Sequence, residues 1–510
     1  MSPRHLAPSP RAAAVVTLAV ALAATACGSG REFRAPKTLS EGRPSRTATP
    51  GGELVDEPFR AAPPPPVASK LRALANPIEV RLSNGIRVVM LERHDFPSIS
   101  MVFVLERGAA AAPPGVATLY ADALTQSSEE YKAGEAWQYL QFVGASIDGD
   151  AWRDAVVLQF TAVTPLFVSA LSRAAPMFTN PKLDGDELDE ERTQLAARTA
   201  RDKDDPSEIA YDAVYASVFP SHPYGVPISG ARARTASSGG SRTPVAATDA
   251  AVRAFRDGHL AAENVSVACA GDLNPALIQK VLESKLGKLP KRASAPPLVF
   301  PALPVKSGRK VLVIDRPGSA QSTVAIGWPG PRASSPELVA LDVLASATAG
   351  DLSTRLNITV RKELGATYGV HMTAAELREG GLIRITAAID TARTVDALKG
   401  LFRELGRLRS EPLAANELTA AKLRTHLDLE QGSTRGLARY LAVALANGKP
   451  PAFVVQHNAR VEVITADDVR AAAERWLSPD EAHVVVVGDA ARIVEGLRTL
   501  GIGDVTVASK

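Results

Sequence analysis

The chain has 510 residues, which is enough for two to four domains with sizeable cores. Its 58 Lys and Arg residues nearly balance its 55 Asp and Glu residues. It has no long basic run and no basic stretch interleaved with aromatic residues, so the composition argues against a nucleic-acid-binding protein.

The N-terminal segment has the features of an export signal. Arg4 and Arg11 precede an apolar run at residues 12–24, which is shorter than the roughly 20 residues needed to span a bilayer. Small residues then precede Cys27, and this arrangement resembles a bacterial lipobox, in which the cysteine is lipidated. The residue after Cys27 is not Asp, which favours the outer membrane over the inner one. An ordinary cleavage site with an incidental cysteine is the alternative.

We therefore predict a lipoprotein signal peptide at residues 1–27 and a lipid-anchored protein on the periplasmic face of the outer membrane. Residues 28–74 are rich in Pro, Ser, Gly and Arg and contain few apolar residues. Such a segment cannot bury a core, so it predicts a disordered tether. The second cysteine, Cys269, lies in an apolar run and is predicted to be buried and structural.

The first half of the body begins with a hairpin pattern. Two alternating segments, 78–82 and 86–90, flank Asn84-Gly85, a pair typical of tight hairpin turns. The pattern then predicts, in chain order, a strand at 98–105, a helix at 115–127, a longer helix after 133, a strand at 154–162 and helices across 165–203.

The second half repeats this order. It predicts strands at 310–315, 323–328 and 381–389 and helices at 336–349, 394–409 and 415–431. Each half also ends in an apolar strand that runs into Gly-Asp, at 264–272 and at 482–489. This internal duplication predicts an α+β fold of two homologous repeats, each a largely antiparallel sheet with helices packed on one face.

Three short segments carry a family resemblance. They are Leu-Ser-Asn-Gly-Ile-Arg-Val at 82–88, Ser-His-Pro-Tyr-Gly at 221–225 and Arg-Lys-Glu-Leu-Gly-Ala-Thr-Tyr at 361–368. Their order across two repeats resembles the peptidase M16 family, which includes insulin-degrading enzyme and the mitochondrial processing peptidase. The resemblance implies an N-terminal M16-like domain at 75–290, a linker at 291–309 and a C-terminal M16-like domain at 310–500.

Members of that family that cleave peptides carry the inverted zinc motif H-x-x-E-H on a helix of the first repeat. Aligned with this chain, the two His positions hold Thr118 and Asp122, and the Glu position holds Ala121. A further ligand Glu on a downstream helix is replaced by Ala197 or Arg198. These side chains cannot form a catalytic zinc site, so we predict that the chain binds no metal.

The histidines offer no substitute for the motif. The chain contains eight of them, and no two lie within five residues of each other. Two imidazoles therefore cannot come from one helical turn. An independent zinc peptidase would need a site assembled from distant residues.

The resemblance also implies a substrate-handling pair in the second repeat, Arg361 and Tyr368, with Gly365 ending the helix between them. In the shorter members of the family, an Arg and a Tyr at this spacing face the zinc site and support the developing oxyanion. A solvated arginine and a core or edge tyrosine are the alternative interpretation.

Two functional hypotheses follow. In the first, the chain is the non-zinc-binding subunit of a cell-envelope M16-type metallopeptidase complex, and it contributes Arg361 and Tyr368 to the hydrolysis of unfolded peptides. A partner with an intact H-x-x-E-H motif would then bind the zinc. In the second, the chain is a catalytically inactive scaffold or peptide-binding lipoprotein.

Overall fold

The computed structural model describes residues 75–132, 134–230, 247–292, 299–302, 308–427 and 432–508. The predicted signal peptide, Cys27 and the predicted tether lie outside these residues. Within the described residues, no helix is both long enough and apolar enough to cross a membrane.

The first half contains a six-stranded sheet with the strand order β1-β2-β6-β3-β5-β4. All neighbouring strands are antiparallel except β2 and β6. The predicted hairpin is confirmed, since Ile78 pairs with Met90 and the turn glycine Gly85 has a φ of 95°. The strands are β1 (Ile78–Arg81), β2 (Arg87–Glu92), β3 (Ser98–Leu105), β4 (Ser146–Ala151), β5 (Val156–Val163) and β6 (Val265–Gly271).

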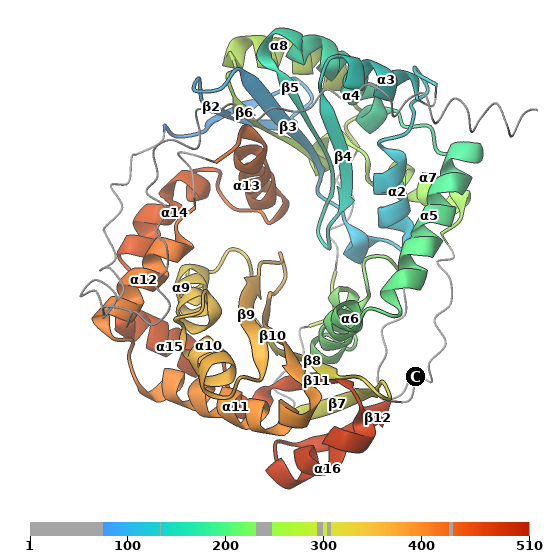
Figure 1. Cartoon of the computed structure of the whole chain (residues 1–510). Coiled ribbons are helices and arrows are strands. Elements are labelled where there is room, and N and C mark those ends of the chain that lie inside the picture. The colour runs from blue at the N-terminus through green and yellow to red at the C-terminus, as the bar shows by residue number, and fades with distance from the viewer. Residues whose placement is uncertain are drawn as a thin grey trace, which may run out of the picture. The chain divides into compact units, whose positions relative to one another are not determined.

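Helices of the same half lie over one face of this sheet, among them α3, α4 and α8 (Figure 1). The α-helices are α2 (Val116–Ala123), α3 (Glu135–Phe142), α4 (Phe167–Thr179), α5 (Asp186–Asp202), α6 (Pro206–Val218), α7 (Asp249–His259) and α8 (Pro275–Leu286). Short 3₁₀ turns occur at η3 (Ala109–Ala111), η4 (Thr164–Leu166), η5 (Pro223–Gly225) and η6 (Ala262–Asn264).

The second half repeats this topology in the order β12-β7-β11-β8-β10-β9. The parallel pair β7 and β11 corresponds to β2 and β6, and the remaining pairs are antiparallel except β12 with β7. The strands are β7 (Lys310–Asp315), β8 (Gln321–Pro329), β9 (Thr367–Ala375), β10 (Leu382–Asp390), β11 (His483–Gly488) and β12 (Asp504–Ala508).

The helices of the second half pack on its sheet in the same way. They are α9 (Leu338–Ala349), α10 (Arg355–Asn357), the π-helical η7 (Ile358–Glu363), α11 (Thr394–Ser410), α12 (Ala415–Thr425), α13 (Thr434–Ala446), α14 (Ala452–Glu462), α15 (Ala466–Trp476) and α16 (Ala490–Leu500). The turns η8 (Thr391–Arg393) and η9 (Pro479–Glu481) precede α11 and β11.

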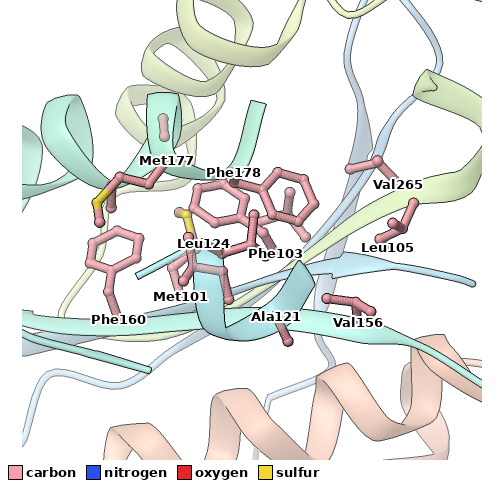
Figure 2. Packing of buried hydrophobic residues seen from close by; sticks show 14 of the residues in the cluster. Met101, Phe103, Leu105, Ala121, Leu124, Val156, Phe160, Met177, Phe178 and Val265 are labelled. Carbon is pink, nitrogen blue, oxygen red and sulfur yellow. The ribbon is translucent and has the colours of Figure 1, made fainter. Parts of the chain in front are cut away.

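The core of the first half lies between its sheet and its own helices (Figure 2). Phe103 of β3 stacks on Phe178 of α4, with ring centroids 5.1 Å apart, and on Phe160 of β5 at 6.0 Å. Cys269 of β6 is fully buried in this core, as predicted.

The opposite face of each sheet is covered by one helix from the other half. Helix α13, which lies between β10 and β11 in the chain, packs on β3 and β6 of the first sheet. In return, α6 of the first half packs on β8 and β11 of the second sheet. Each half therefore completes the core of the other, which explains why the central strands β3, β6 and β11 are buried on both faces.

One glycine permits the close approach of α6. A Cβ atom at Gly327 of β8 would lie only 2.5 Å from a methyl carbon of Val214 on α6. Because Gly327 has no side chain, α6 can pack directly on β8.

The exchanged helices should contribute strongly to stability. Leu441 of α13 is fully buried against the first sheet. We expect Leu441→Ala to lower the free energy of unfolding by about 2–5 kcal/mol through lost burial and a residual cavity. Denaturant unfolding measures this loss. Leu277→Ala is the control, because Leu277 on α8 is 49% exposed and should change stability by no more than about 0.5 kcal/mol. Equal effects of the two substitutions would contradict the packing described here.

A buried acid on α9 predicts a pH dependence. Burial, with the nearby Glu376 carboxylate, raises the pKa of Asp342 to about 7, although the Lys449 ammonium opposes the rise. An unfolded Asp titrates near pH 3.9, so between roughly pH 4 and pH 7 the folded chain holds a proton that the unfolded chain has lost. Stability should therefore fall as the pH rises through this window, by on the order of 2 kcal/mol. Asp342→Asn should flatten this change, measured by denaturant unfolding at pH 5 and pH 8. The control variant Asp396→Asn, which changes an exposed aspartate, should keep the pH dependence of the wild type.

The α+β class and the two-repeat architecture are confirmed, but the sequence prediction missed several strands and several helices. The predicted helix 115–127 ends at Ala123, and the stretch after 133 forms only the eight-residue α3. The edge strand β4 was not predicted, because its sequence Ser-Ile-Asp-Gly-Asp-Ala has low β-propensity. The prediction also missed the edge strands β9 and β12 and the helices α6, α7, α13, α14 and α15. Helix α12 ends at Thr425 rather than at residue 431.

Candidate functional site

The degenerate motif lies on one face of α2. Thr118, Ala121 and Asp122 follow the i, i+3, i+4 spacing that aligns side chains on a helix. They line a cavity of about 390 Å³. The Thr118 hydroxyl donates a hydrogen bond to the Ile228 carbonyl over 2.7 Å, so its proton is already committed. Ala121 is buried and carries no donor atom for a metal.

At the third motif position, Asp122 forms an ion pair. The Asp122 carboxylate accepts a hydrogen bond from the Arg198 guanidinium of α5, which is 76 residues away in the chain. Burial raises the pKa of Asp122, and the adjacent Arg198 opposes that rise. The two ligand candidates on α5 are thereby distinguished, because Arg198 lines the cavity and Ala197 is exposed.

These residues do not fit a zinc ion. Zinc requires neutral imidazole or anionic ligands, whereas here the Asp122 carboxylate is paired with the Arg198 guanidinium. Across the described residues, no group of three or more His, Cys, Asp or Glu side chains is placed to hold a metal ion. The ion pair instead supplies the positive charge that a metal would bring to this carboxylate.

The second-repeat pair is brought together at the start of β9. Arg361 lies on the π-helical η7, which ends at Glu363, and Gly365 follows with the positive φ of 58° that is typical after a helix. The Arg361 guanidinium donates to the backbone carbonyl of Tyr368 over 2.5 Å. The Tyr368 side chain is 84% exposed, so its hydroxyl is accessible to a ligand.

The position of this pair depends on a residue that sequence reasoning missed. The buried Asn357 donates to the Val370 carbonyl over 3.0 Å and accepts from the Val370 backbone amide over 2.8 Å. This two-way bridge ties the helix that carries Arg361 to the strand that carries Tyr368. An asparagine at the end of a helix gives no local signal of such a contact.

Arg361 and Tyr368 line a cavity of about 630 Å³. Two residues of α6, Glu208 and Tyr211, line this cavity and also the smaller cavity at the degenerate motif. The structure therefore brings the degenerate motif and the second-repeat pair to two cavities that share one helix. The Arg384 guanidinium lies 4.5 Å from the Tyr211 ring centroid and holds that ring in place from the larger cavity.

Sequence reasoning also missed α6, although its start carries a recognisable signal. Asp205 accepts a hydrogen bond from the Ser207 backbone amide over 2.7 Å, and Pro206 occupies the first helical position. Asp followed by Pro is a common helix start. Burial raises the pKa of Glu208, and the carboxylates of Asp202 and Asp205 add to the rise.

Matches to two protein-family models identify the family of this chain. Residues 95–232 match the model of the insulinase domain of peptidase family M16, and residues 246–424 match the model called the peptidase M16 inactive domain. This chain belongs to the peptidase M16 family. The resemblance inferred from three short segments is thus confirmed.

Curated M16 relatives align with most of this chain. An uncharacterized zinc protease of Mycobacterium bovis is 25% identical over 427 residues, which cover 82% of this chain and 94% of the relative. The uncharacterized zinc protease YmxG of Bacillus subtilis is 20% identical over 387 residues, covering 75% and 89%. These relatives are named as zinc proteases, whereas this M16 chain has no H-x-x-E-H motif at residues 118–122.

Two solved structures share the fold. One is a peptidase M16 inactive domain from Pseudomonas fluorescens, with a TM-score of 0.73 and 21% identity over 81% of this chain and 98% of that one. The other is a protease from Helicobacter pylori, with a TM-score of 0.73 and 18% identity over 81% and 100%. At these identities the likeness concerns the fold alone.

Proposed function

We propose that this M16 protein is the non-zinc-binding subunit of a peptidase complex at the cell envelope. It contributes half of the peptide chamber, together with Arg361 and Tyr368, while a partner with an intact H-x-x-E-H motif binds the zinc. The substrates are unfolded peptides. The observation that carries the proposal is the asymmetry between the two sites: the metal ligands are replaced, but the Arg and Tyr remain together on an open cavity.

The donor groups of Arg361 and Tyr368 suit a subunit that binds the peptide while its partner binds the zinc. An arginine N–H and a tyrosine O–H are donors suited to a developing oxyanion or to a substrate carbonyl. Neither group can activate water in place of a metal. The chain by itself would therefore bind and orient a peptide without cleaving it, and hydrolysis would require the zinc-bearing partner.

The test is to purify the tagged protein from its native membranes and to follow cleavage of a quenched fluorescent peptide with and without a chelator. Chelator-sensitive activity that co-purifies with a second chain, and that is absent from this chain made alone, supports the proposal. A well-folded native complex without activity would instead support a catalytically inactive scaffold or peptide-binding role. Activity and about one tightly bound zinc in the isolated chain would contradict both.

The location is part of the same proposal. Lipidation of Cys27 would place the protein on the periplasmic face of the outer membrane, with residues 28–74 as its tether. Cys27→Ser should release the protein from the membrane fraction without changing the folding of the body. Equal membrane association of both forms would show that Cys27 is not the anchor.

A further inference from the structure

A buried arginine that donates no side-chain hydrogen bond to any described residue lies beside the candidate site. Arg153 occupies the turn between β4 and β5 and is only 4% exposed. No described residue accepts a hydrogen bond from any of its three guanidinium nitrogens, and no described carboxylate pairs with it. A buried guanidinium normally has such partners, because removing its charge and its N–H groups from water is costly.

The backbone at this turn is firmly held. The carbonyls of Trp152 and Arg153 accept hydrogen bonds from the backbone amides of Ala109 and Ala110, each over 2.9 Å. The guanidinium carbon of Arg153 lies 3.7 Å from the ring centroid of Tyr215 on α6. The ring face offsets part of the buried charge, but it does not accept hydrogen bonds in the guanidinium plane.

Arg153 lines a cavity of about 270 Å³, together with Trp152, Tyr211, Tyr215 and Arg439. This volume exceeds that of several water molecules and is enough for a carboxylate group and its stem. Tyr211 also lines both cavities of the candidate site. The cavity at Arg153 is therefore an extension of that site along α6.

The acids that line this cavity are already engaged. Asp154 accepts hydrogen bonds from the Tyr224 hydroxyl over 2.7 Å and from the Arg378 backbone amide over 2.9 Å. Glu376 pairs with the Lys449 ammonium over 2.5 Å. Arg439, at the same cavity, pairs with Asp150 over 3.3 Å. Arg153 is therefore the charged residue of this cavity from which no described side chain accepts a hydrogen bond, and its positive charge favours an anion.

We propose that Arg153 is the anchor of a subsite that binds a carboxylate of the peptide, either its C-terminus or an Asp or Glu side chain. A planar guanidinium is suited to bidentate binding of a carboxylate. The inference rests on the proposed peptide-binding function and adds a substrate preference to it, since peptides that place a carboxylate beside Tyr211 are favoured.

The test measures binding of fluorescein-labelled peptides to the full chain by fluorescence anisotropy. Four versions of one unstructured peptide are used, with either Glu or Gln near the C-terminus and with either a free or an amidated C-terminus. Arg153→Gln should weaken binding of the carboxylate-bearing versions about ten- to hundredfold and leave the neutral amidated version unchanged. The version that loses most identifies which carboxylate is bound.

Two further variants control the comparison. Arg153→Lys keeps the charge and should retain part of the carboxylate preference, whereas a purely structural role predicts no difference among the four peptides. Arg470→Gln on α15 changes an arginine outside these cavities and should bind as the wild type does. Equal binding of all four peptides to wild type and to Arg153→Gln overturns the subsite but leaves the proposed function standing. Failure of the wild-type chain to bind any version overturns both.

Discussion

A triple variant, Thr118→His with Asp122→His and Arg198→Glu, is expected to bind about one zinc ion per chain, while the wild type binds no stoichiometric zinc. The two new imidazoles would lie one helical turn apart on α2. The glutamate would replace a guanidinium that already reaches residue 122, so the third ligand is within range and the repelling charge is gone. Ala121 is left unchanged, because a Glu there would serve as a base rather than as a ligand.

Equilibrium dialysis followed by elemental analysis measures the bound zinc. The matched control carries the same two histidines with Ala197→Glu and an intact Arg198. Since Ala197 is exposed on α5 and does not line the cavity, this control should bind zinc far more weakly. Equal zinc contents in the two variants, or none in the triple variant, would refute the geometry given for α2 and α5.

Arg361→Ala is expected to lower kcat of the complex with its zinc-bearing partner by about 10²- to 10³-fold, the range found for removing one oxyanion donor. The peptide should still bind, because much of the chamber surface is unchanged. Single-turnover and steady-state cleavage of a quenched fluorescent peptide separate these effects. Arg470→Ala, which changes a surface arginine of α15, should leave kcat unaltered.

The Tyr368→Phe variant distinguishes a role of the tyrosine hydroxyl in the reaction from a role of Arg361 in holding the start of β9. Arg361 donates to the backbone carbonyl of Tyr368, so removing the arginine also loosens the start of β9. Phenylalanine keeps that carbonyl and the ring but removes the exposed hydroxyl. A fall in kcat with Tyr368→Phe as well as with Arg361→Ala would indicate that both donors act on the substrate. Unchanged cleavage by both variants would exclude this role.

Much of the fold could be predicted from the sequence because the patterns that indicate its turns and strands lie within short segments. The Asn84-Gly85 hairpin and the duplicated apolar strands at 265–271 and 483–488 follow from residue type and from period. The prediction failed where a local sequence is ambiguous. β4 contains two aspartates and a glycine and forms a strand because β5 pairs with it, not because of its own propensity.

The candidate site was predictable only in part. The lack of a zinc site at 118, 121 and 122 follows from the residue types once the family motif is aligned, since threonine and alanine are not zinc ligands and Asp122 alone is not a site. The contribution of α6 was not predictable, because Glu208 and Tyr211 reach both cavities only after α6 leaves its own half and packs on the second sheet.

The sequence by itself determined the family, the two-repeat α+β fold and the loss of the zinc motif, because these depend on residue types and on short-range periodicity. Only the tertiary structure decided which side chain of α5 faces Asp122 and that α6 and α13 exchange between the halves. It also decided that no described residue accepts a hydrogen bond from the buried Arg153 guanidinium. Each of these depends on contacts between segments far apart in the chain. The free energy of such contacts comes from packing and desolvation, which no local pattern of residues records.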